Sequence, residues 1–402
     1  MKFFKCLFLA LFLPFSAFAG VNLKNGNFYI SYTDIVVPGG GSDLKISRTY
    51  NSKATEVGWF GFGWGSDYET YLTVAADGSV VVHENGSGAK TRFTPKQPVD
   101  PKSAAKKIVA AMRKKTSISD KVASDLKEKL TKDAELRQAY ARKFDVKAKL
   151  ATGTKLFSNT RGLQEVHKTK DGYKRVYNDG KVEHFNQDGH LAKMKDKNGY
   201  EVTLKYSNSG EVKSIKDSQS KQLFFDWYSN GLVKSISKPG NEKVLYKYKD
   251  EDLVYSKDIA GNVFKYDYDT NHNLVVIKYD DDSEKKISYT QKTQFVEMVE
   301  ERDGKKREYV YDSNPKKPKH HYWTTVEKKG ASGKKVKNRY EYEIKTRPDG
   351  SQYTYRILTR VNGVETETIY SECCSLPLKI KKGKHVTNFE YNDKGLLTKK
   401  TS

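Results

Sequence analysis

Glycines recur at a fixed interval of 21 residues in the middle of the chain, at Gly189, Gly210 and Gly231. An aromatic residue precedes each glycine by four positions, and apolar residues follow it at the second and fifth positions. The aromatic residues are Phe185, Tyr206 and Trp227, and the apolar residues are Leu191, Met194, Val212, Ile215, Val233 and Ile236. The later units lack the glycine and pair Tyr248 with Val254, Tyr268 with Leu274 and Ile277, and Tyr289 with Phe295 and Met298. A fixed period indicates one small unit whose neighbours bury together what each cannot bury alone.

One unit, residues 199–215, shows what is repeated. Its first arm alternates apolar or aromatic residues with polar ones from Tyr200 to Tyr206, which is typical of a strand with one buried face. The Ser-Asn-Ser-Gly run at 207–210 has the composition of a turn. The unit therefore predicts a hairpin, and tandem hairpins predict an all-β fold. We expect a curled antiparallel β-sheet or partial shell, with a small inserted α-helical lobe.

The repeated runs resemble the YD repeats of the Rhs family. The runs are YSNSGEVKSI from Tyr206, WYSNGLVKSI from Trp227, YDTNHNLVVI from Tyr268 and YNDKGLL from Tyr391. The segments SRTYNS (47–52), GFGWGSDYETYL (61–72) and ADGSVVVHENGSGAKTRF (76–93) resemble the stretch that leads into such repeats. The resemblance implies a β-sheet shell that encloses or displays something. The usual C-terminal processing motif and toxin domain are not found, and seven or eight units look too few to close a full shell.

The first 19 residues have the order of a secretory signal peptide. Two lysines precede a run of Phe and Leu, and Ala17-Phe18-Ala19 supplies the cleavage pattern before Gly20. A buried N-terminal helix is the alternative. No later stretch approaches the roughly 20 apolar residues of a membrane-spanning helix. We therefore expect a protein that is secreted, periplasmic or at the cell surface, without a transmembrane span.

Positive charge is concentrated in two segments. Residues 101–150 contain 15 basic and 6 acidic residues, and residues 315–402 contain 20 basic and 9 acidic residues. Residues 151–314 are almost neutral, with 29 basic and 27 acidic residues. We divide the chain into a signal peptide (1–19), an Rhs-like lead-in (20–99), a helical lobe (100–150), a YD-repeat body (151–314) and a basic β section that ends in a repeat (315–402).

Residues 101–150 interrupt the β pattern and predict three short amphipathic helices. Their apolar faces are Ala105, Ile108, Val109 and Met112, then Val122, Leu126 and Leu130, then Leu136, Tyr140 and Phe144. Ser119 or Asp120, and Asp133, are the expected N-caps. The lysines form either a solvated surface or a docking surface for an anionic partner. In the second case Lys106, Lys107, Lys114 and Lys115 are the candidate binding residues.

The run NPKKPKHHYW at 314–323 places cations beside aromatic rings. Amines meet anions and aromatic rings stack on sugar or base rings, so an acidic polymer is a possible ligand. The candidate residues are Lys316, Lys317, Lys319, His320, Tyr322 and Trp323. An extracellular address favours an anionic glycan, a lipid surface or another envelope protein over genomic nucleic acid. The alternative is that these lysines only keep loops soluble.

The mature chain has two cysteines, Cys373 and Cys374, which are adjacent. Neighbouring Cα atoms lie about 3.8 Å apart, below the range that an ordinary disulfide prefers. A vicinal disulfide, free thiols and an intermolecular bond all remain open. Two adjacent thiolates do not supply the four ligands of a structural zinc site. We expect no metal and no cofactor.

No motif of a hydrolase, a metalloprotease or a nucleotide-binding loop occurs in the sequence. We therefore expect a secreted, non-enzymatic YD-repeat scaffold or binding protein at the cell envelope that recognises an anionic glycan, a lipid or another polyanion. A partial shell that houses a separately encoded effector is the first alternative. A glycan-active enzyme is the second, although the sequence selects no catalytic pair of acids.

Overall fold

The computed structural model describes most of the chain after the expected signal peptide. The described residues are 18–40, 42–86, 88–96, 100–158, 163–329, 335–348, 350–373, 375–392 and 395–402. The expected signal peptide therefore lies outside them, apart from its last two residues. These fall in the first strand, where Phe18 pairs with Ser31 and Ala19 pairs with Ile30.

A small sheet from the N-terminal segment lies inside the molecule. This inner sheet is antiparallel, in the order β1-β2-β3-β6. Its strands are β1 (Phe18–Asn22), β2 (Asn27–Val37), β3 (Leu44–Asn51) and β6 (Trp64–Ser66). A short pair, β4 (Val57–Gly58) and β5 (Gly61–Phe62), and a 3-10 turn, η1 (Asp67–Glu69), flank β6.

The remaining strands form one large antiparallel sheet, the wall, in which nearly all neighbours are consecutive in sequence. From the lead-in come β7 (Tyr71–Val74), β8 (Val80–Glu84) and β9 (Ala89–Pro95). Next are β10 (Lys155–Ser158), β11 (Gln164–Thr169), β12 (Gly172–Tyr177), β13 (Val182–Phe185), β14 (Leu191–Lys195), β15 (Glu201–Tyr206), β16 (Val212–Asp217), β17 (Gln222–Trp227) and β18 (Val233–Ser237). Then follow β19 (Lys243–Lys249), β20 (Asp252–Lys257), β21 (Val263–Tyr268), β22 (Leu274–Lys278), β23 (Glu284–Tyr289), β24 (Val296–Glu300) and β25 (Lys306–Ser313). The last are β26 (His321–Lys329), β27 (Lys335–Thr346), β28 (Gln352–Val361), β29 (Val364–Tyr370), β30 (Pro377–Lys382), β31 (His385–Tyr391) and β32 (Leu397–Thr401).

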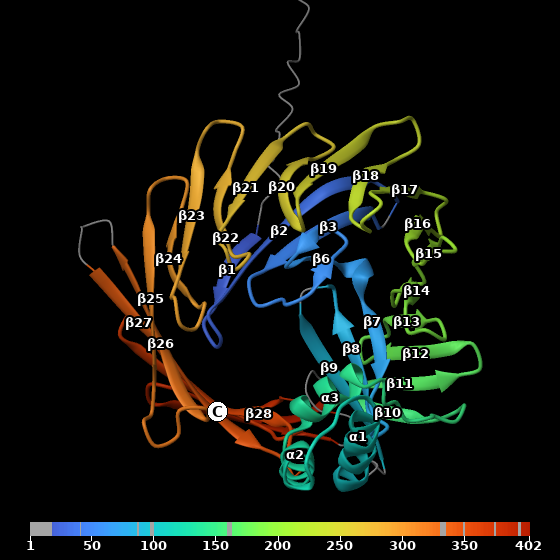
Figure 1. Cartoon of the computed structure of the whole chain (residues 1–402). Coiled ribbons are helices and arrows are strands. Elements are labelled where there is room, and N and C mark those ends of the chain that lie inside the picture. The colour runs from blue at the N-terminus through green and yellow to red at the C-terminus, as the bar shows by residue number, and fades with distance from the viewer. Residues whose placement is uncertain are drawn as a thin grey trace, which may run out of the picture.

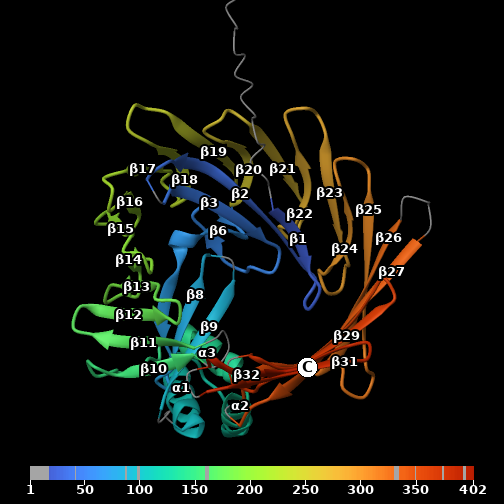
Figure 2. The same cartoon turned by 180° about the vertical axis from the view of Figure 1, so that it is seen from behind.

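The wall curls around the inner sheet, as both views show (Figure 1, Figure 2). The sheet is closed. Tyr71 at the start of β7 forms a bridge with His190, and the Leu72 amide donates to the Gly189 carbonyl at 2.8 Å. At the other end of the wall, the turn around Gly395 packs against Leu163. The closed sheet includes strands of the lead-in and of the C-terminal section as well as the repeats, so the repeats do not close it alone.

The repeats fold into hairpins, and the resemblance in their sequence is matched by a common burial pattern. Val212, Val233 and Leu274, one in each of three units, are fully buried. In two units the predicted apolar positions are shifted. Leu253 is buried in place of Val254, and Val296 and Val299 are buried more deeply than Phe295 and Met298. The turn after Tyr248 is one residue shorter, and the turn after Tyr289 is one residue longer, than in the units with the glycine.

Neighbouring hairpins pair over only three residues and diverge beyond them, which leaves a wedge between the hairpins. The repeated aromatic residue occupies this wedge. Its polar tip donates a hydrogen bond to the carbonyl 15 residues earlier, at the start of the preceding strand. The bonds are Tyr206 to Leu191 (2.7 Å), Trp227 to Val212 (2.8 Å), Tyr248 to Val233 (2.9 Å), Tyr268 to Leu253 (2.9 Å) and Tyr289 to Leu274 (3.1 Å). The aromatic ladder thus caps carbonyls that the divergence leaves without a strand partner.

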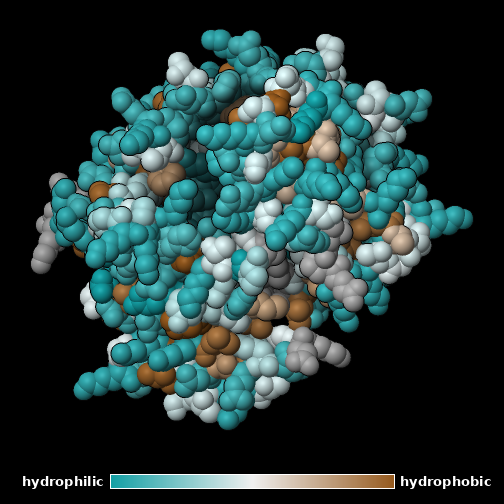
Figure 3. Space-filling model, turned by 60° about the horizontal axis from the view of Figure 1, so that its bottom comes forward, coloured by the Kyte–Doolittle hydropathy of each residue, from teal (hydrophilic) through white to brown (hydrophobic). Residues whose placement is uncertain are grey.

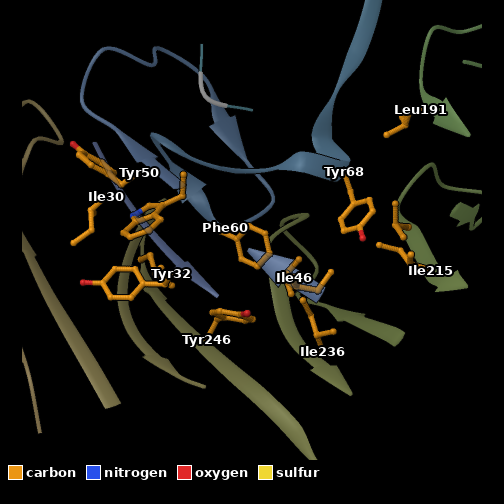
Figure 4. Close-up of a cluster of buried hydrophobic side chains, with 14 of the residues drawn as sticks. Ile30, Tyr32, Ile46, Tyr50, Phe60, Tyr68, Leu191, Ile215, Ile236 and Tyr246 are labelled. Carbon is orange, nitrogen blue, oxygen red and sulfur yellow. The ribbon is translucent and has the colours of Figure 1, made fainter. Parts of the chain in front are cut away.

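The inner sheet and the wall share one hydrophobic core. Figure 4 shows Ile30, Tyr32 and Phe60 of the N-terminal segment facing residues of the repeats such as Tyr246. The Phe60 and Tyr246 rings lie 5.1 Å apart in a T-shaped contact. Main-chain bonds also join the two layers, since the Val233 amide donates to the Trp59 carbonyl at 2.8 Å. The inner face of the repeats is therefore covered by the N-terminal segment of the chain.

A buried ion pair lies between the layers. Arg48 of β3 and Asp34 of β2 are 0% and 1% exposed, and the Arg48 Nε lies 2.7 Å from the Asp34 Oδ2. The Tyr246 hydroxyl of the wall donates to the same Asp34 oxygen at 2.7 Å. Arg48 also donates to the hydroxyls of Ser256 (2.7 Å) and Tyr266 (2.8 Å). This network fixes the inner sheet to strands more than 200 residues away in sequence.

The helical lobe is inserted between β9 and β10, which pair with each other. The prediction of three helices is confirmed, with α1 (Pro101–Lys115), α2 (Asp120–Lys132) and α3 (Ala134–Lys143). Ser119 and Asp133 cap α2 and α3 as expected. Val122 is 51% exposed, and Ala123 is buried instead, because Ala123 lies on the same face of the helix as Leu130. None of these helices is both long and apolar enough to cross a membrane, among the residues described.

We predict that Trp227→Ala lowers the free energy of unfolding by about 3–5 kcal/mol, as is typical when a packed aromatic residue is truncated. The indole ring meets Trp59 at 5.7 Å in addition to its hydrogen bond to Val212. Denaturant unfolding followed by circular dichroism measures the change. The exposed Lys234→Ala is the control, with an expected change below about 0.5 kcal/mol. A similarly small loss for Trp227→Ala would show that the ladder contributes no stability.

We predict that Arg48→Met destabilises the protein by about 3–5 kcal/mol, because it leaves Asp34 as an unpaired buried charge. The double variant Arg48→Met/Asp34→Leu removes both charges and should recover part of that loss. Thermal unfolding of both variants gives the comparison. A double variant that is less stable than Arg48→Met alone would contradict this account of the pair.

Candidate functional site

The lysines predicted on the helical lobe are exposed along α1. Lys106 and Lys107 lie in its middle, and Lys114 and Lys115 lie in its last turn. Positive charge at the end of a helix interacts favourably with the helix dipole, so the last turn tolerates this cluster. The opposite face of α1 buries Ile108 among the other helices. The fold therefore holds these amines outward.

The predicted C-terminal lysines lie on the connection between β25 and β26. Lys316, Lys317 and Lys319 are all exposed there. The turn is held by its own backbone, since the amides of Lys317 and His320 donate to the carbonyls of Asn314 and Lys317 at 3.0 Å. Within the described residues, none of the candidate lysines on this turn or on α1 forms an ion pair. Their charge is consequently available to a partner.

The loops at one end of the wall connect the two basic segments. The His320 Nε2 lies 3.3 Å from the Thr346 Oγ1, which joins the lysine turn to the turn between β27 and β28. A side chain on Gly350, in that same turn, would collide with the Lys132 carbonyl at the end of α2. In Figure 1 the helices lie at the lower end of the molecule and β28 runs toward them. We call this end, formed by α1–α3 and residues 314–320, 346–348 and 350–351, the lower rim.

The surface at the lower end is predominantly hydrophilic, with scattered apolar groups, where that end is turned toward the viewer (Figure 3). Residues 101–150 and 315–402 together contain 35 of the 73 Lys and Arg residues, obtained from 15 and 20, but only 15 of the 50 Asp and Glu residues, obtained from 6 and 9. The two segments that contain most of the excess positive charge of the protein therefore meet at Gly350.

The aromatic residues predicted beside these lysines do not form one binding surface. Tyr322 and Trp323 follow each other in β26 and so point to opposite faces of the wall. Tyr322 pairs with Tyr342, with ring centres 5.7 Å apart. Trp323 is covered by the Arg339 guanidinium at 4.1 Å. Both rings have partners in the fold and are half-buried, as His320 is, whereas the three lysines are exposed.

A histidine of β26 and two carboxylates of β27 lie close to one another. The ligand atoms of His321, Glu341 and Glu343 lie within 4.8 Å of each other. Cations of the protein already occupy this site, because Arg356 contacts Glu343 at 2.8 Å and Arg339 contacts Glu341 at 2.9 Å. Burial raises the pKa of Glu341, but hydrogen bonds from His321 and Arg339 outweigh it and lower that pKa overall. We interpret the group as a structural ion-pair network.

Cys373 is disulfide-bonded and exposed on the connection between β29 and β30. Cys374 lies outside the described residues. The loop is held to the rim because the Arg347 guanidinium donates to the Glu372 carbonyl. The disulfide therefore lies in a loop that contacts the lower rim, and it is not part of the hydrophobic core.

A cleft of about 310 Å³ between the lead-in and β14–β15 contains the most perturbed acidic group. Burial raises the pKa of Glu69 to about 8, against the opposing hydrogen bonds from the amides of Trp59 (2.6 Å) and Ser66 (2.8 Å). Glu56, at the same cleft, accepts bonds from Tyr71 (2.9 Å) and Arg142 (3.0 Å), and its pKa is lowered. Every carboxylate oxygen is thus bonded to the protein, and the two acids act as clamps on the loops.

The sequence analysis did not identify this cleft. One local signal was present, since Ser66 and Glu69 have the spacing of a capping box at the start of η1. The contact between Glu56 and Arg142 joins the lead-in to the helical lobe across 86 residues of sequence. No periodicity in the chain indicates such a pairing.

The comparisons with known proteins concern mainly the N-terminal segment. Residues 19–93 match a family model described as "Domain of unknown function (DUF6531)", and they correspond to β1–β9. The tRNA3(Ser)-specific nuclease WapA of Bacillus spizizenii is 36% identical over 76 residues, which are 19% of this chain and 3% of that protein. Both findings fit the Rhs-like resemblance of the lead-in.

Solved structures of Tc toxins align over almost the whole chain at low similarity. The TcdB2-TccC3-Cdc42 complex aligns over 92% of this chain and 22% of that chain, with 8% identity and a TM-score of 0.29. The Tc holotoxin pore of Photorhabdus luminescens aligns over 92% and 23%, with 9% identity and a TM-score of 0.28. This chain therefore spans less than a quarter of these structures and a small fraction of the curated nuclease.

We predict an acid-induced loss of stability that depends on His83 in β8. Burial, with Arg142 and Lys90 nearby, lowers the pKa of His83 to about 4 from the ordinary histidine value of about 6.5. Between these values the unfolded chain binds a proton that the folded chain does not, so stability falls as the pH falls from about 6.5 to about 4. This pKa shift lowers the free energy of unfolding by at most about 3 kcal/mol.

The measurement is the free energy of unfolding of the parent and of His83→Gln across this pH range. The amide does not titrate, so the variant should show a shallower slope. His385→Gln, at an exposed position of β31, is the control and should retain the parent slope. Identical slopes for the parent and His83→Gln would exclude His83 as the source.

Proposed function

We propose that the protein is an exported, non-enzymatic β-shell scaffold that binds an anionic glycan through its lower rim. The observation that carries this proposal is the meeting of two basic segments, separated by more than 160 residues of sequence, beside Gly350. Like charges gathered at one place repel each other, so their proximity is most easily explained by a partner of opposite charge.

The chemistry of the rim favours a polymer over a small molecule. The candidate lysines are exposed and mobile point charges, spread over α1 and the turn at 314–320. Such a surface attracts a chain with regularly spaced carboxylates or sulfates, whose many weak contacts add together. The aromatic rings of Tyr322 and Trp323 are already paired within the fold, so stacking on sugar rings is not part of the proposal.

The acids in the described part of the chain support a non-enzymatic function. Glycoside cleavage requires one free acid and one free carboxylate beside the bond that breaks. Glu69 and Glu56 share a cleft and have pKa values shifted in opposite directions, but their oxygens bond to Trp59, Ser66, Tyr71 and Arg142. Their environment is that of structural carboxylates.

The test uses the full mature chain, polygalacturonate as the anionic glycan and dextran as a neutral one. The variant Lys316→Glu/Lys317→Glu/Lys319→Glu should weaken binding of polygalacturonate by at least about tenfold at low salt. Reversal at Lys106, Lys107 and Lys114 should have a similar effect. The affinity should also fall steeply with salt, since exposed charges are screened over about 8 Å at physiological ionic strength. Isothermal titration calorimetry measures both effects.

The matched control reverses the same number of charges on the repeats, at the exposed Lys205, Lys213 and Lys234. We expect it to bind nearly as well as the parent. An equal loss in the control would mean that net charge, and not the rim, determines binding. Binding to phosphatidylglycerol vesicles but not to polygalacturonate would replace the glycan by a lipid surface.

A further inference from the structure

One wedge between the hairpins differs from the others. In the wedges before β15, β17, β19, β21 and β23, the aromatic residue of the later strand donates to a carbonyl 15 residues earlier. Tyr311 of β25 has the same spacing from Val296, the first residue of β24. Its hydroxyl is nevertheless buried without a hydrogen-bond partner among the described residues. The wedge between β24 and β25 therefore lacks the hydrogen bond that bridges each of the other five wedges.

The tip of the hairpin between β1 and β2 lies at this wedge. The Val296 amide donates to the Gly26 carbonyl at 2.9 Å, and a side chain on Gly26 would collide with Phe295. The same tip reaches the next strands, because the Thr324 hydroxyl donates to the Leu23 carbonyl at 2.6 Å. The main chain at the start of β24 is thus hydrogen-bonded to the inner sheet. Tyr311 lies on β25, which pairs with β26.

A cleft of about 830 Å³ occupies this position. The ladder between β24 and β25 ends at the pair Met298 and Glu308, whereas β25 continues to pair with β26 as far as Ser313. Five residues of β25, 309–313, therefore have no neighbouring strand on the side of β24. The corresponding stretches in β15, β17, β19, β21 and β23 are three or four residues long. This free edge is the longest within the repeats.

The lining of the cleft combines apolar groups with negative charge. Phe295, Tyr309 and Tyr311 lie on its inner side, and the Phe295 and Tyr311 rings are 5.0 Å apart. Val310 is 52% exposed beside it. Glu297 and Glu308 are the charged residues of the lining, and none of the described lining residues is basic. Two lysines border the lining: Lys335 lies 3.8 Å from Glu308, and Lys53 lies 4.5 Å from the ring centre of Phe295. Glu297 has no ion pair within the described residues, and it supplies the negative charge open to a partner.

We propose that this cleft binds an extended peptide segment of a partner protein, which adds as a strand to the free edge of β25. Unpaired amides and carbonyls at strand spacing are complementary to another strand and not to a sugar. Successive side chains of the peptide would point alternately toward Tyr309 and Tyr311 and toward Glu297 and Glu308. The fitting segment alternates apolar and basic residues. This site is separate from the lower rim and does not depend on the proposed glycan function.

The experiment measures fluorescence anisotropy of a labelled hexapeptide that alternates valine and lysine, with the full mature chain. Three further peptides serve as probes: one with glutamate in place of lysine, one with scrambled order, and one N-methylated at alternate amides. We expect binding of the first peptide and at least about tenfold weaker binding of the N-methylated one, which cannot form the ladder. The glutamate peptide should not bind.

Variants of the cleft locate the site. Glu297→Lys/Glu308→Lys should weaken binding by at least about tenfold, and Tyr311→Phe by a few fold, because it removes only the hydroxyl. The control Glu365→Lys/Glu390→Lys changes the same charge at exposed positions of β29 and β31 and should bind as the parent does. Circular dichroism establishes that each variant is folded. A small effect of Tyr311→Phe on stability is expected, since the hydroxyl has no partner to lose.

Several results would overturn the proposal. They are equal binding of the N-methylated peptide, equal losses in the control variant, and undiminished binding by Glu297→Lys/Glu308→Lys. Concentration-dependent self-association that the same double substitution abolishes would make a second copy of the chain the occupant and exclude a partner peptide. Loss of peptide binding in the variant at Lys316, Lys317 and Lys319 would place the site at the lower rim instead.

Discussion

A single curved sheet cannot fold alone, because one of its faces must be removed from water. In this protein the inner face of the repeats is covered by the N-terminal sheet, and the two layers share one core. The Arg48–Asp34 pair lies at this contact, where the Tyr246 hydroxyl of the wall donates to Asp34 and Arg48 donates to the Tyr266 hydroxyl. A buried pair contributes less to stability than to specificity, since an inner sheet shifted along the wall would leave both charges unpaired. The ion pair thus sets the register of the two layers.

The aromatic ladder solves a second problem of the same geometry. Hairpins that diverge can follow a curved surface, but divergence separates main-chain groups from their partners. Each tyrosine or tryptophan in the ladder supplies a donor to a carbonyl that would otherwise be unsatisfied, and its ring fills the gap. The repeat is therefore defined by a bond between hairpins as much as by the hairpin itself. The 15-residue spacing of this bond explains why the period is maintained while the glycine is lost after Gly231.

Local patterns in the sequence predicted local structure well. The hairpins, the three helices and the caps Ser119 and Asp133 follow from periodicity and from side-chain chemistry within a few residues. Contacts between distant residues were not predictable, because nothing near Arg48 indicates a partner such as Tyr266. Side chains alternate between the two faces of a strand, so the sequence did imply that Tyr322 and Trp323 point apart. The composition of 314–323 had nevertheless grouped them into one site, which the fold separates.

The two candidate surfaces differ in how the fold treats charge. Along residues 151–314, basic and acidic residues nearly balance, 29 against 27. At the lower rim the candidate lysines of α1 and of residues 316–319 have no ion pair within the described residues. At the β24–β25 cleft Glu308 lies 3.8 Å from Lys335, whereas Glu297 has no ion pair within the described residues. Charges of one sign that are left together reduce stability unless a ligand compensates them. The two proposed partners therefore depend on different charges: the glycan on the unpaired lysines of the lower rim, and the peptide on Glu297 and the free edge of β25.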